Sequence, residues 1–222
     1  MVCEIVKNKQ IKTAPLTHEF HLYEQGYTRI GGIDEVGRGC IAGSIVVCAI
    51  IMPKGVTIPG VTDSKKLSPK SREWLATEIK EVAIAYKVAF CASTLIDLNG
   101  IQQATFWAMQ EAIKGLQGQP DALLADGKPL KWKLSHTLPC EYIVRGDSLS
   151  HSIAAASIVA KVERDAYMCE MHEMYPKYGF NQHKGYGTRL HFETIEKYGL
   201  CPLHRRSFLK KELKWDKEID KV

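Results

Sequence analysis

One pattern constrains the fold of this 222-residue chain more than any other: an apolar, strand-like segment ends in an acidic residue at three separate places. The three acids are Asp34, Asp126 and Asp147. Short apolar runs bounded by glycine-containing turns predict buried strands. When strands of one sheet each carry an acid at or near an end, the carboxylates can meet at a single edge of that sheet. The sequence therefore predicts one acidic site built from separate strands.

Strand-like segments alternate with helix-like segments along the chain. We expect strands over residues 29–34, 41–52, 86–93, 121–127 and 142–147, and helices over residues 16–25, 68–82, 99–116, 150–174 and 188–198. Ser68 and Pro69 provide an N-cap and a first-turn proline for the second helix. This alternation is typical of a mixed α/β fold around one central sheet. A chain of this length suits a single domain with a substantial core.

By composition the chain divides into three parts. Residues 1–15 are a polar extension, residues 16–208 are the expected folded domain with helices at its C-terminal end, and residues 209–222 are a basic tail. The charge is uneven, because residues 176–222 hold 11 Lys or Arg and 6 Asp or Glu, whereas residues 1–175 hold 19 of each. Clustered basic residues favour a polyanionic partner. A lysine-rich solubilising tail is the alternative that charge alone leaves open.

Cysteine usage and hydropathy indicate the compartment. The seven cysteines form no Cys-x-x-Cys pair, and their odd number and apolar neighbours predict reduced, mostly buried thiols. The N-terminal residues lack the apolar core of a signal peptide, and no segment has the length and apolarity needed to cross a bilayer. We therefore expect a soluble, cytoplasmic protein that has no membrane contact and acts as a monomer.

The segment Asp34-Glu35-Val36-Gly37-Arg38-Gly39 combines acids with a glycine loop. Glycines let the backbone approach an oxyanion, whereas carboxylates repel phosphate unless a divalent cation lies between them. Oxygen ligands without a histidine or cysteine pair favour Mg²⁺ or Mn²⁺ over zinc. Two such ions can activate a water and stabilise a leaving oxygen, so the pattern indicates metal-assisted cleavage of a phosphodiester. For the hexapeptide by itself, a solvated acidic turn is the alternative.

Two further acids need separate interpretation. Successive side chains of a strand point to opposite faces, so Asp34 and Glu35 cannot both face one metal centre if the strand is regular. Glu35 can then contribute through a bend, through its backbone carbonyl or by holding a metal-bound water. Asp165 lies in a predicted helix beside Lys161 and Arg164. For Asp165 we expect an ion pair or a solvated position rather than a metal ligand.

Six motifs, taken in order, resemble those of bacterial ribonuclease HII over residues 28–208. They are Asp34-Glu35-Val36-Gly37-Arg38-Gly39, Asp63-Ser64-Lys65-Lys66-Leu67, Ala125-Asp126-Gly127, Gly146-Asp147-Ser148, Ala155-Ala156-Ser157-Ile158-Val159-Ala160-Lys161-Val162-Glu163-Arg164-Asp165 and Lys184-Gly185-Tyr186-Gly187-Thr188. Each motif is weak alone, but six in the order of the family are specific. The resemblance implies a ribonuclease H-like fold, with a central mixed sheet flanked by helices and a small helical C-terminal part.

The same resemblance implies an activity and a site. It implies an endonuclease that cuts on the 5′ side of ribonucleotides in duplex DNA or in RNA/DNA hybrids, leaving 3′-hydroxyl and 5′-phosphate ends, in ribonucleotide removal from DNA and RNA primer removal. By position, the catalytic and metal-binding residues are Asp34, Glu35, Asp126 and Asp147, and the substrate-binding residues are Gly37, Arg38, Gly39, Lys65, Lys66 and Tyr186. The glycine loop corresponds to the family's sensor of the 2′-hydroxyl. The two lysines correspond to phosphate contacts, and the tyrosine to one that packs on the following deoxyribose.

Three histidines and two departures from the family pattern are also notable. His151 follows Asp147 by about one helical turn and could protonate a leaving group, although a bystander is the favoured interpretation. For His183 and His204, which lie among basic residues, phosphate contact and solvation are comparable expectations. Cys40 and Ser44 stand where many relatives have proline, which can soften the turn after the glycine loop.

Other functions compete with nuclease activity. Sugar kinases also begin with a Gly-Ile-Asp strand, but here Arg38 and Gly39 follow the loop glycine, and the chain is short for two domain halves. Resolvases and transposases share the acidic fold, and residues 184–188 argue against them. A non-catalytic nucleic-acid binder fits the basic tail, but it gives no reason for several buried strands to end in acids.

Overall fold

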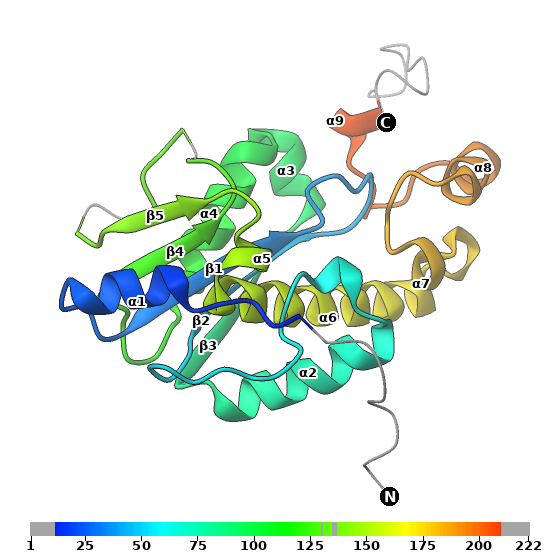
Figure 1. Cartoon of the computed structure of the whole chain (residues 1–222). Coiled ribbons are helices and arrows are strands. Elements are labelled where there is room, and N and C mark those ends of the chain that lie inside the picture. Colours follow the sequence, from blue (N-terminus) through cyan, green and yellow to red (C-terminus); the bar gives the residue numbers. More distant parts are fainter. Residues whose placement is uncertain (1–11, 130, 135–136, 210–222) are drawn as a thin grey trace, which may run out of the picture.

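The computed structural model describes residues 12–129, 131–134 and 137–209, so the basic tail after Leu209 and the first part of the extension lie outside the described residues. In the described part, one five-stranded sheet has the order β3-β2-β1-β4-β5 (Figure 1). Its strands are β1 (Ile30–Val36), β2 (Ile45–Ile51), β3 (Ala85–Cys91), β4 (Ala122–Asp126) and β5 (Cys140–Ile143). β2 is antiparallel to β1 and β3, whereas β4 is parallel to β1 and β5. The mixed central sheet is confirmed.

The five expected helices occur in the expected order, and the described residues also form four short helices, α3, α5, α7 and α9. They are α1 (Thr17–Glu24), α2 (Pro69–Val82), α3 (Ser93–Asn99), α4 (Ile101–Lys114), α5 (Gly146–Leu149), α6 (His151–Met174), α7 (Phe180–His183), α8 (Arg189–Tyr198) and α9 (Arg206–Leu209), with short 3-10 turns η1 (Ser64–Lys66) and η2 (Pro176–Tyr178). The predicted cap of α2 is confirmed, because Ser68 Oγ accepts a hydrogen bond from the Ser71 N–H at 3.1 Å.

The sequence did not reveal α3, which was assigned partly to a strand and partly to the helix after it. Ser93, predicted as the end of a strand, begins α3 instead. Gly100 then separates α3 from α4 with a φ of +80°, a left-handed conformation that only glycine adopts without strain. The helix expected from residue 99 or 100 is present as α4, which begins at Ile101 after Gly100.

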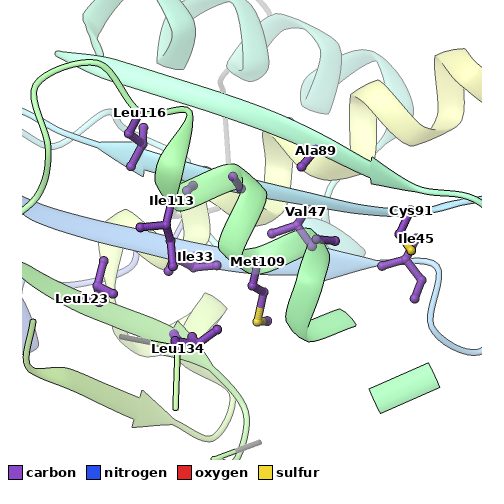
Figure 2. Packing of buried hydrophobic residues seen from close by; sticks show 14 of the residues in the cluster. Ile33, Ile45, Val47, Ala89, Cys91, Met109, Ile113, Leu116, Leu123 and Leu134 are labelled. Carbon is purple, nitrogen blue, oxygen red and sulfur yellow. The ribbon is translucent and has the colours of Figure 1, made fainter. Parts of the chain in front are cut away.

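The sheet is buried on both faces, and β2 shows this most clearly. Val47, Ala49 and Ile51 pack toward α4, where Figure 2 shows the apolar cluster that also contains Met109. The alternate residues Cys48 and Ile50 pack toward α2 and α6. Because successive side chains of a strand face opposite ways, an entirely apolar strand is the expected sequence for a position between two helical layers.

Helix α6 lies directly against the middle of the sheet. A Cβ on Gly32 of β1 would lie 2.3 Å from the backbone carbon of Ser152, so only glycine allows this approach. Ala154, Ala155 and Ala156 are fully buried in the same contact. The small residues at the start of this helix allow the close backbone packing, which brings α6 next to the acidic strand ends.

Packed structure begins before residue 16. Ala14 is buried, and its N–H donates to the Val61 carbonyl at 2.8 Å. Pro15 accepts a hydrogen bond from the His151 N–H at 3.0 Å. The segment just ahead of α1 is thus attached to the start of α6. Among the described residues, no helix combines the length and apolarity needed to cross a membrane.

Candidate active site

Asp34 and Asp126 are brought together by the pairing of parallel strands. β1 and β4 are in register at Ile33 and Ala125, so the two acids are the next residues on adjacent strands. Ile33 and Ala125 belong to the core on the α4 side, which directs Asp34 and Asp126 to the opposite face, toward α6. Asp34 is only 7% exposed. The sequence prediction that these two acids meet at a sheet edge is confirmed.

The pKa of Asp34 reflects its burial and the closeness of the neighbouring carboxylates. Burial raises the pKa of Asp34 well above its usual range, and the nearby Glu35 and Asp126 carboxylates raise it further. Hydrogen bonds from Ser157 of α6 and from the Glu35 N–H, which lies 2.7 Å from Asp34 Oδ1, act in the opposite direction but do not cancel the rise. Like charges in a poorly solvated site disfavour joint ionisation. A cation between the carboxylates would relieve that repulsion.

Glu35 lies on a regular strand, because β1 continues to Val36. By the alternation of side chains, Glu35 is expected on the face opposite Asp34, but its carboxylate still raises the pKa of Asp34. Its Oε1 atom accepts a hydrogen bond from Arg38 Nη1 at 3.0 Å. Burial raises the pKa of Glu35, while Arg38 lowers it. This contact connects the acidic site to the glycine loop.

Asp147 corrects one part of the sequence prediction. It does not end a strand: β5 stops at Ile143, the chain turns at Arg145 with a φ of +62°, and Asp147 lies in the short helix α5. It still reaches the site, because the Gly146 N–H donates to Asp126 Oδ1 at 2.6 Å. Asp147 is 7% exposed, and burial raises its pKa, with further increases from Asp63 and Asp126.

The acids are close without forming a closed metal cage. Among the residues that the structure describes, no group of three or more His, Cys, Asp or Glu side chains is arranged to hold an ion by itself. Asp126 influences the pKa of Asp34, Glu35 and Asp147, so it is the central member of the cluster. Asp165 lies outside the cluster and pairs with Lys161 at 2.6 Å, which confirms the predicted ion pair.

The glycine loop and the Tyr186 loop lie side by side. Gly37 has a φ of +92°, and Arg38 and Gly39 are exposed. The Gly185 carbonyl accepts hydrogen bonds from the N–H groups of Ile41 and Ala42 at 2.9 and 3.2 Å, which joins the two loops. The tyrosine itself is 42% exposed beside this junction. Two predicted substrate-binding segments, far apart in the sequence, therefore form one surface.

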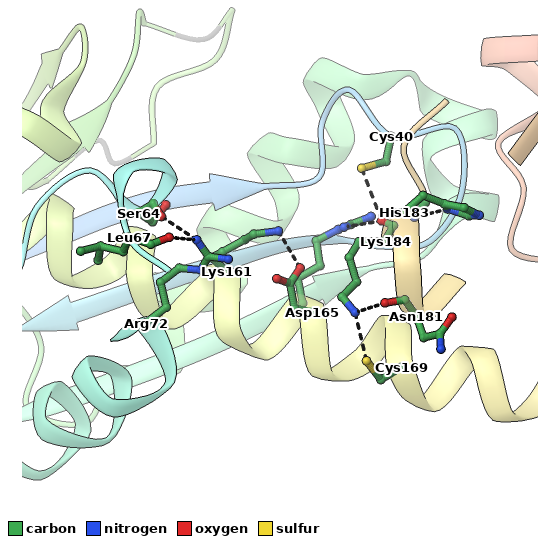
Figure 3. A network of polar contacts seen from close by, with 12 residues as sticks. Cys40, Ser64, Leu67, Arg72, Lys161, Asp165, Cys169, Asn181, His183 and Lys184 are labelled. Carbon is green, nitrogen blue, oxygen red and sulfur yellow. Dashed lines mark hydrogen bonds and ion pairs between the residues drawn. The ribbon is translucent and has the colours of Figure 1, made fainter. Parts of the chain in front are cut away.

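The lysine loop borders the acids from the other side. Lys65 and Lys66 are exposed in η1, whose N-cap Asp63 accepts a hydrogen bond from the Lys65 N–H at 3.0 Å. Ser64 Oγ lies 3.0 Å from Ser157 Oγ, in a buried contact that holds this loop against α6. Figure 3 shows the adjoining network, in which Arg72 donates to the carbonyls of Ser64 and Leu67.

Sequence reasoning missed Asp63 as a neighbour of the acids. Burial acts to raise the pKa of Asp63, but hydrogen bonds from the Lys65 N–H and from Lys66 outweigh it and lower that pKa. Asp63 in turn raises the pKa of Asp147. The only sequence signal for Asp63 is its position inside the Asp-Ser-Lys-Lys motif, and from that motif a role was predicted for the two lysines alone.

The expectations for His183 and His204 need correction, whereas the burial of His151 agrees with its favoured interpretation as a bystander. His183 and His204 are 8% and 3% exposed, so neither phosphate contact nor solvation describes them. His183 accepts a hydrogen bond from the Gly185 N–H at Nδ1 and bonds to the Tyr178 carbonyl through Nε2. His151 is fully buried, and its Nε2 atom accepts a hydrogen bond from the Ile58 N–H at 3.1 Å. All three serve the core rather than the surface.

Comparison with known proteins agrees with this arrangement. The family model described as Ribonuclease HII matches residues 31–211. A ribonuclease HII of Halalkalibacterium halodurans is 47% identical over 193 residues, which cover 87% of this chain and 72% of that protein. The crystal structure of ribonuclease H2 from Pyrococcus horikoshii superposes with a TM-score of 0.69 at 24% identity, covering 83% of this chain and 96% of that one. Bst-RNase HIII in complex with Mn²⁺ gives a TM-score of 0.66 at 18% identity, covering 84% and 70% respectively.

Proposed function

This chain belongs to the ribonuclease HII family, and from that premise we propose that it cuts on the 5′ side of ribonucleotides embedded in duplex DNA or in RNA/DNA hybrids. The products would carry 3′-hydroxyl and 5′-phosphate ends. As a family member the protein is a nuclease of the ribonuclease H type. Family membership displaces the kinase, transposase and binder alternatives.

The observation that carries this proposal is the placement of the buried Asp34 and the half-buried Asp126 on adjacent strand ends beside the glycine loop. A purely structural role gives no reason to place a second carboxylate next to the buried Asp34 on the adjacent strand end, because their repulsion is unfavourable. The same pair facing a phosphodiester becomes useful once divalent ions are bound. Asp147 and Glu35 complete the proposed catalytic set.

The donor set fits a hard divalent ion. The candidate ligands offer oxygen atoms only, which suits Mg²⁺ or Mn²⁺, and Mg²⁺ is commonly held by one or two carboxylates together with substrate phosphates rather than by a cage of protein ligands. The raised pKa values of Asp34 and Asp147 agree with a site that gains from bound positive charge. Two bound ions would supply Lewis acidity for water activation and for the leaving oxygen. The Mn²⁺ complex of a relative of the same fold supports this choice.

Substrate selection is proposed to come from the joined loops. In the glycine loop of Gly37, Arg38 and Gly39, the last two residues are exposed, so their backbone is available to the 2′-hydroxyl and the adjoining phosphate of a ribonucleotide. Tyr186 would pack on the next sugar, while Lys65 and Lys66 would contact phosphates. In the cell these properties suit removal of ribonucleotides from DNA and removal of RNA primers. Monomeric and cytoplasmic action stays a prediction.

Cleavage of a duplex that carries one ribonucleotide tests the proposal. The protein is incubated with this duplex, with the matching all-DNA duplex and with an RNA/DNA hybrid, each with Mg²⁺, with Mn²⁺ and with a chelator. We expect metal-dependent cleavage only where a ribonucleotide is present, with the cut 5′ to it. Cleavage that persists in chelator, or cutting of the all-DNA duplex at the same rate, would contradict the proposal.

A further inference from the structure

Two arginines are completely buried next to the substrate loops. Arg164 of α6 and Arg205, just before α9, have no exposed surface. Within the described part of the chain, neither forms an ion pair with a carboxylate, and their partners are backbone carbonyls. Removing an ion from water costs several kcal/mol even after relaxation. A role that requires the guanidinium group explains its retention better than simple filling of space.

Arg164 joins two segments that are distant in sequence. Its Nε and Nη2 atoms donate to the carbonyls of Ser44 and Ala42 at 3.1 and 3.2 Å, just after the glycine loop. Its Nη1 atom donates to the Lys184 carbonyl at 2.8 Å, in the segment that carries Tyr186. One rigid, planar group thus fixes the distance between the two loops.

The Arg164 side chain lies so close to a glycine of each loop that a larger residue would contact it. A Cβ on Gly37 would lie 2.2 Å from Arg164 Nε, and one on Gly185 would lie 3.3 Å from Arg164 Nη2. The Tyr186 ring centroid lies 6.0 Å from Arg164 Cζ, at the outer limit of a cation–π contact. The Arg164 side chain therefore contacts the glycine loop, the loop that carries Tyr186 and the Tyr186 ring itself.

Arg205 supports the same unit from the other side. Its Nε and Nη2 atoms donate to the Gly43 carbonyl at 3.0 and 2.7 Å, and its Nη1 atom donates to the Arg38 carbonyl at 3.0 Å. Arg164 supplies the connection to the Tyr186 segment, which Arg205 does not contact through these bonds.

We propose that Arg164 is a positioning residue that sets the spacing between the glycine loop and Tyr186, and thereby determines how strongly the enzyme prefers a deoxyribonucleotide directly after the ribonucleotide. The inference rests on the proposed function. If one loop reads the 2′-hydroxyl and the other packs on the next sugar, their separation decides which nucleotide pair fits both. Lysine cannot replace the arginine, because a single ammonium lacks the fixed fork that reaches three carbonyls.

The test compares two substrates in Arg164→Lys. One duplex carries a single ribonucleotide followed by DNA, and the other pairs a strand made only of ribonucleotides with DNA. The measured quantity is the ratio of kcat/KM for the first substrate to that for the second. We expect this ratio to fall by about tenfold in the variant, because small displacements of positioning groups have effects of this size or larger. Activity per folded molecule on the all-ribonucleotide strand should change less.

A stability control separates this role from loss of fold. Ile79 is fully buried in α2 and packs in the apolar cluster that α2 forms with β2 and the first half of α6, and the structure gives it no hydrogen bond to either loop, so Ile79→Ala should lower the melting temperature without changing the ratio. If Arg164→Lys does not fold, Gly43→Ala replaces it. Its Cβ would meet Met168 Sδ at 2.5 Å, which displaces the segment that accepts both arginines' hydrogen bonds, and the same fall in ratio is expected.

The possible failures are distinguishable. No cleavage of the single-ribonucleotide duplex by the wild-type protein would refute the proposed function itself. Equal cleavage of both substrates by the wild-type protein, or an unchanged ratio in a folded variant, would leave the proposed function intact and overturn the inference about Arg164.

Discussion

Acidification should destabilise the segment that carries Tyr186, because three buried histidines hold it only in their neutral form. His191 Nδ1 bonds to the Tyr186 carbonyl at 2.9 Å, and its Nε2 atom lies 3.1 Å from His204 Nε2. His204 Nδ1 in turn accepts a hydrogen bond from the Cys201 N–H at 2.9 Å. These partners fix one tautomer: His191 donates at Nδ1, and His204 donates at Nε2.

A second proton on either ring would break this chain of hydrogen bonds. His191 would lose its acceptor atom toward His204, and His204 would place a proton against the Cys201 N–H. Burial lowers the pKa of His191 to about 3 and that of His204 to about 4, and His183 lowers both further. In the unfolded chain a histidine titrates near 6.5. The lowered values mean that folding favours the neutral rings.

The sign and size of the pH effect follow from this difference. The stability that the neutral rings contribute is fully present above the unfolded pKa and is lost as the pH falls toward the folded values. Between about pH 8 and about pH 5 each histidine lowers the free energy of unfolding by ~2 kcal/mol, at ~1.4 kcal/mol for each pH unit below the unfolded pKa. The two together give ~4 kcal/mol, a large part of the ~5–15 kcal/mol typical of a domain.

Urea unfolding followed by tryptophan fluorescence at several pH values would measure this effect. The raised pKa values of Asp34, Glu35 and Asp147 act in the opposite direction, so the wild-type slope alone is not decisive. The comparison is with His204→Gln, which keeps a donor near His191 and removes one titrating group. Its loss of stability between about pH 8 and about pH 5 should be smaller by ~2 kcal/mol.

The matched control is His21→Gln, because His21 is exposed on α1 and should leave the slope unchanged. The reasoning would be refuted if His204→Gln showed the same pH slope as the wild-type protein. A steeper slope would be equally contrary, since it would mean that the folded state binds the proton more readily than the unfolded chain.

Three further outcomes follow from the site and its supports. Asp34→Asn and Asp126→Asn should fold but retain less than about a tenth of the wild-type kcat/KM on a single-ribonucleotide duplex. Mutating even a residue that only supports a metal ligand typically lowers metal affinity or activity by about 10–100-fold. Activity above a tenth would remove the mutated acid from the ligand set. Asp147→Asn should cripple turnover with Mg²⁺, whereas Asp165→Asn should keep most of it, and the opposite ranking would exchange their roles. Glu19→Ala should lower the free energy of unfolding by ~1–3 kcal/mol in a urea titration, because the buried carboxylate accepts two hydrogen bonds from the first turn of α6, and no loss would show that water replaces it.

Much of the active site was readable from local sequence. Apolar runs identified the strands, and the pairing of Asp34 with Asp126 followed from two such runs ending in acids. The regular strand expected at Asp34 and Glu35 is present, because β1 continues to Val36. The ion pair of Asp165 with Lys161 was predictable because it depends only on helical spacing. All of these are properties of a strand or helix by itself, or of two neighbouring strands.

The tertiary structure decided the features that depend on what packs against each residue. Asp147 reaches the site from a short helix, and the strand predicted for it was wrong because the chain turns at Arg145. Asp63 meets Asp147 across 84 residues of sequence, a proximity that no local pattern contains.

The buried basic residues also show the difference between what local sequence predicts and what tertiary packing decides. In the sequence, His183 and His204 lie among basic residues and Arg164 lies beside Asp165, yet the fold buries each of them. Their partners are backbone carbonyls and N–H groups of distant loops, which become available only after those loops are placed. Residue type and spacing therefore determined which side chains could perform the chemistry. Packing determined which charges are withdrawn from water to hold the loops in place, because the free energy of a buried charge depends on the neighbours that the whole fold supplies.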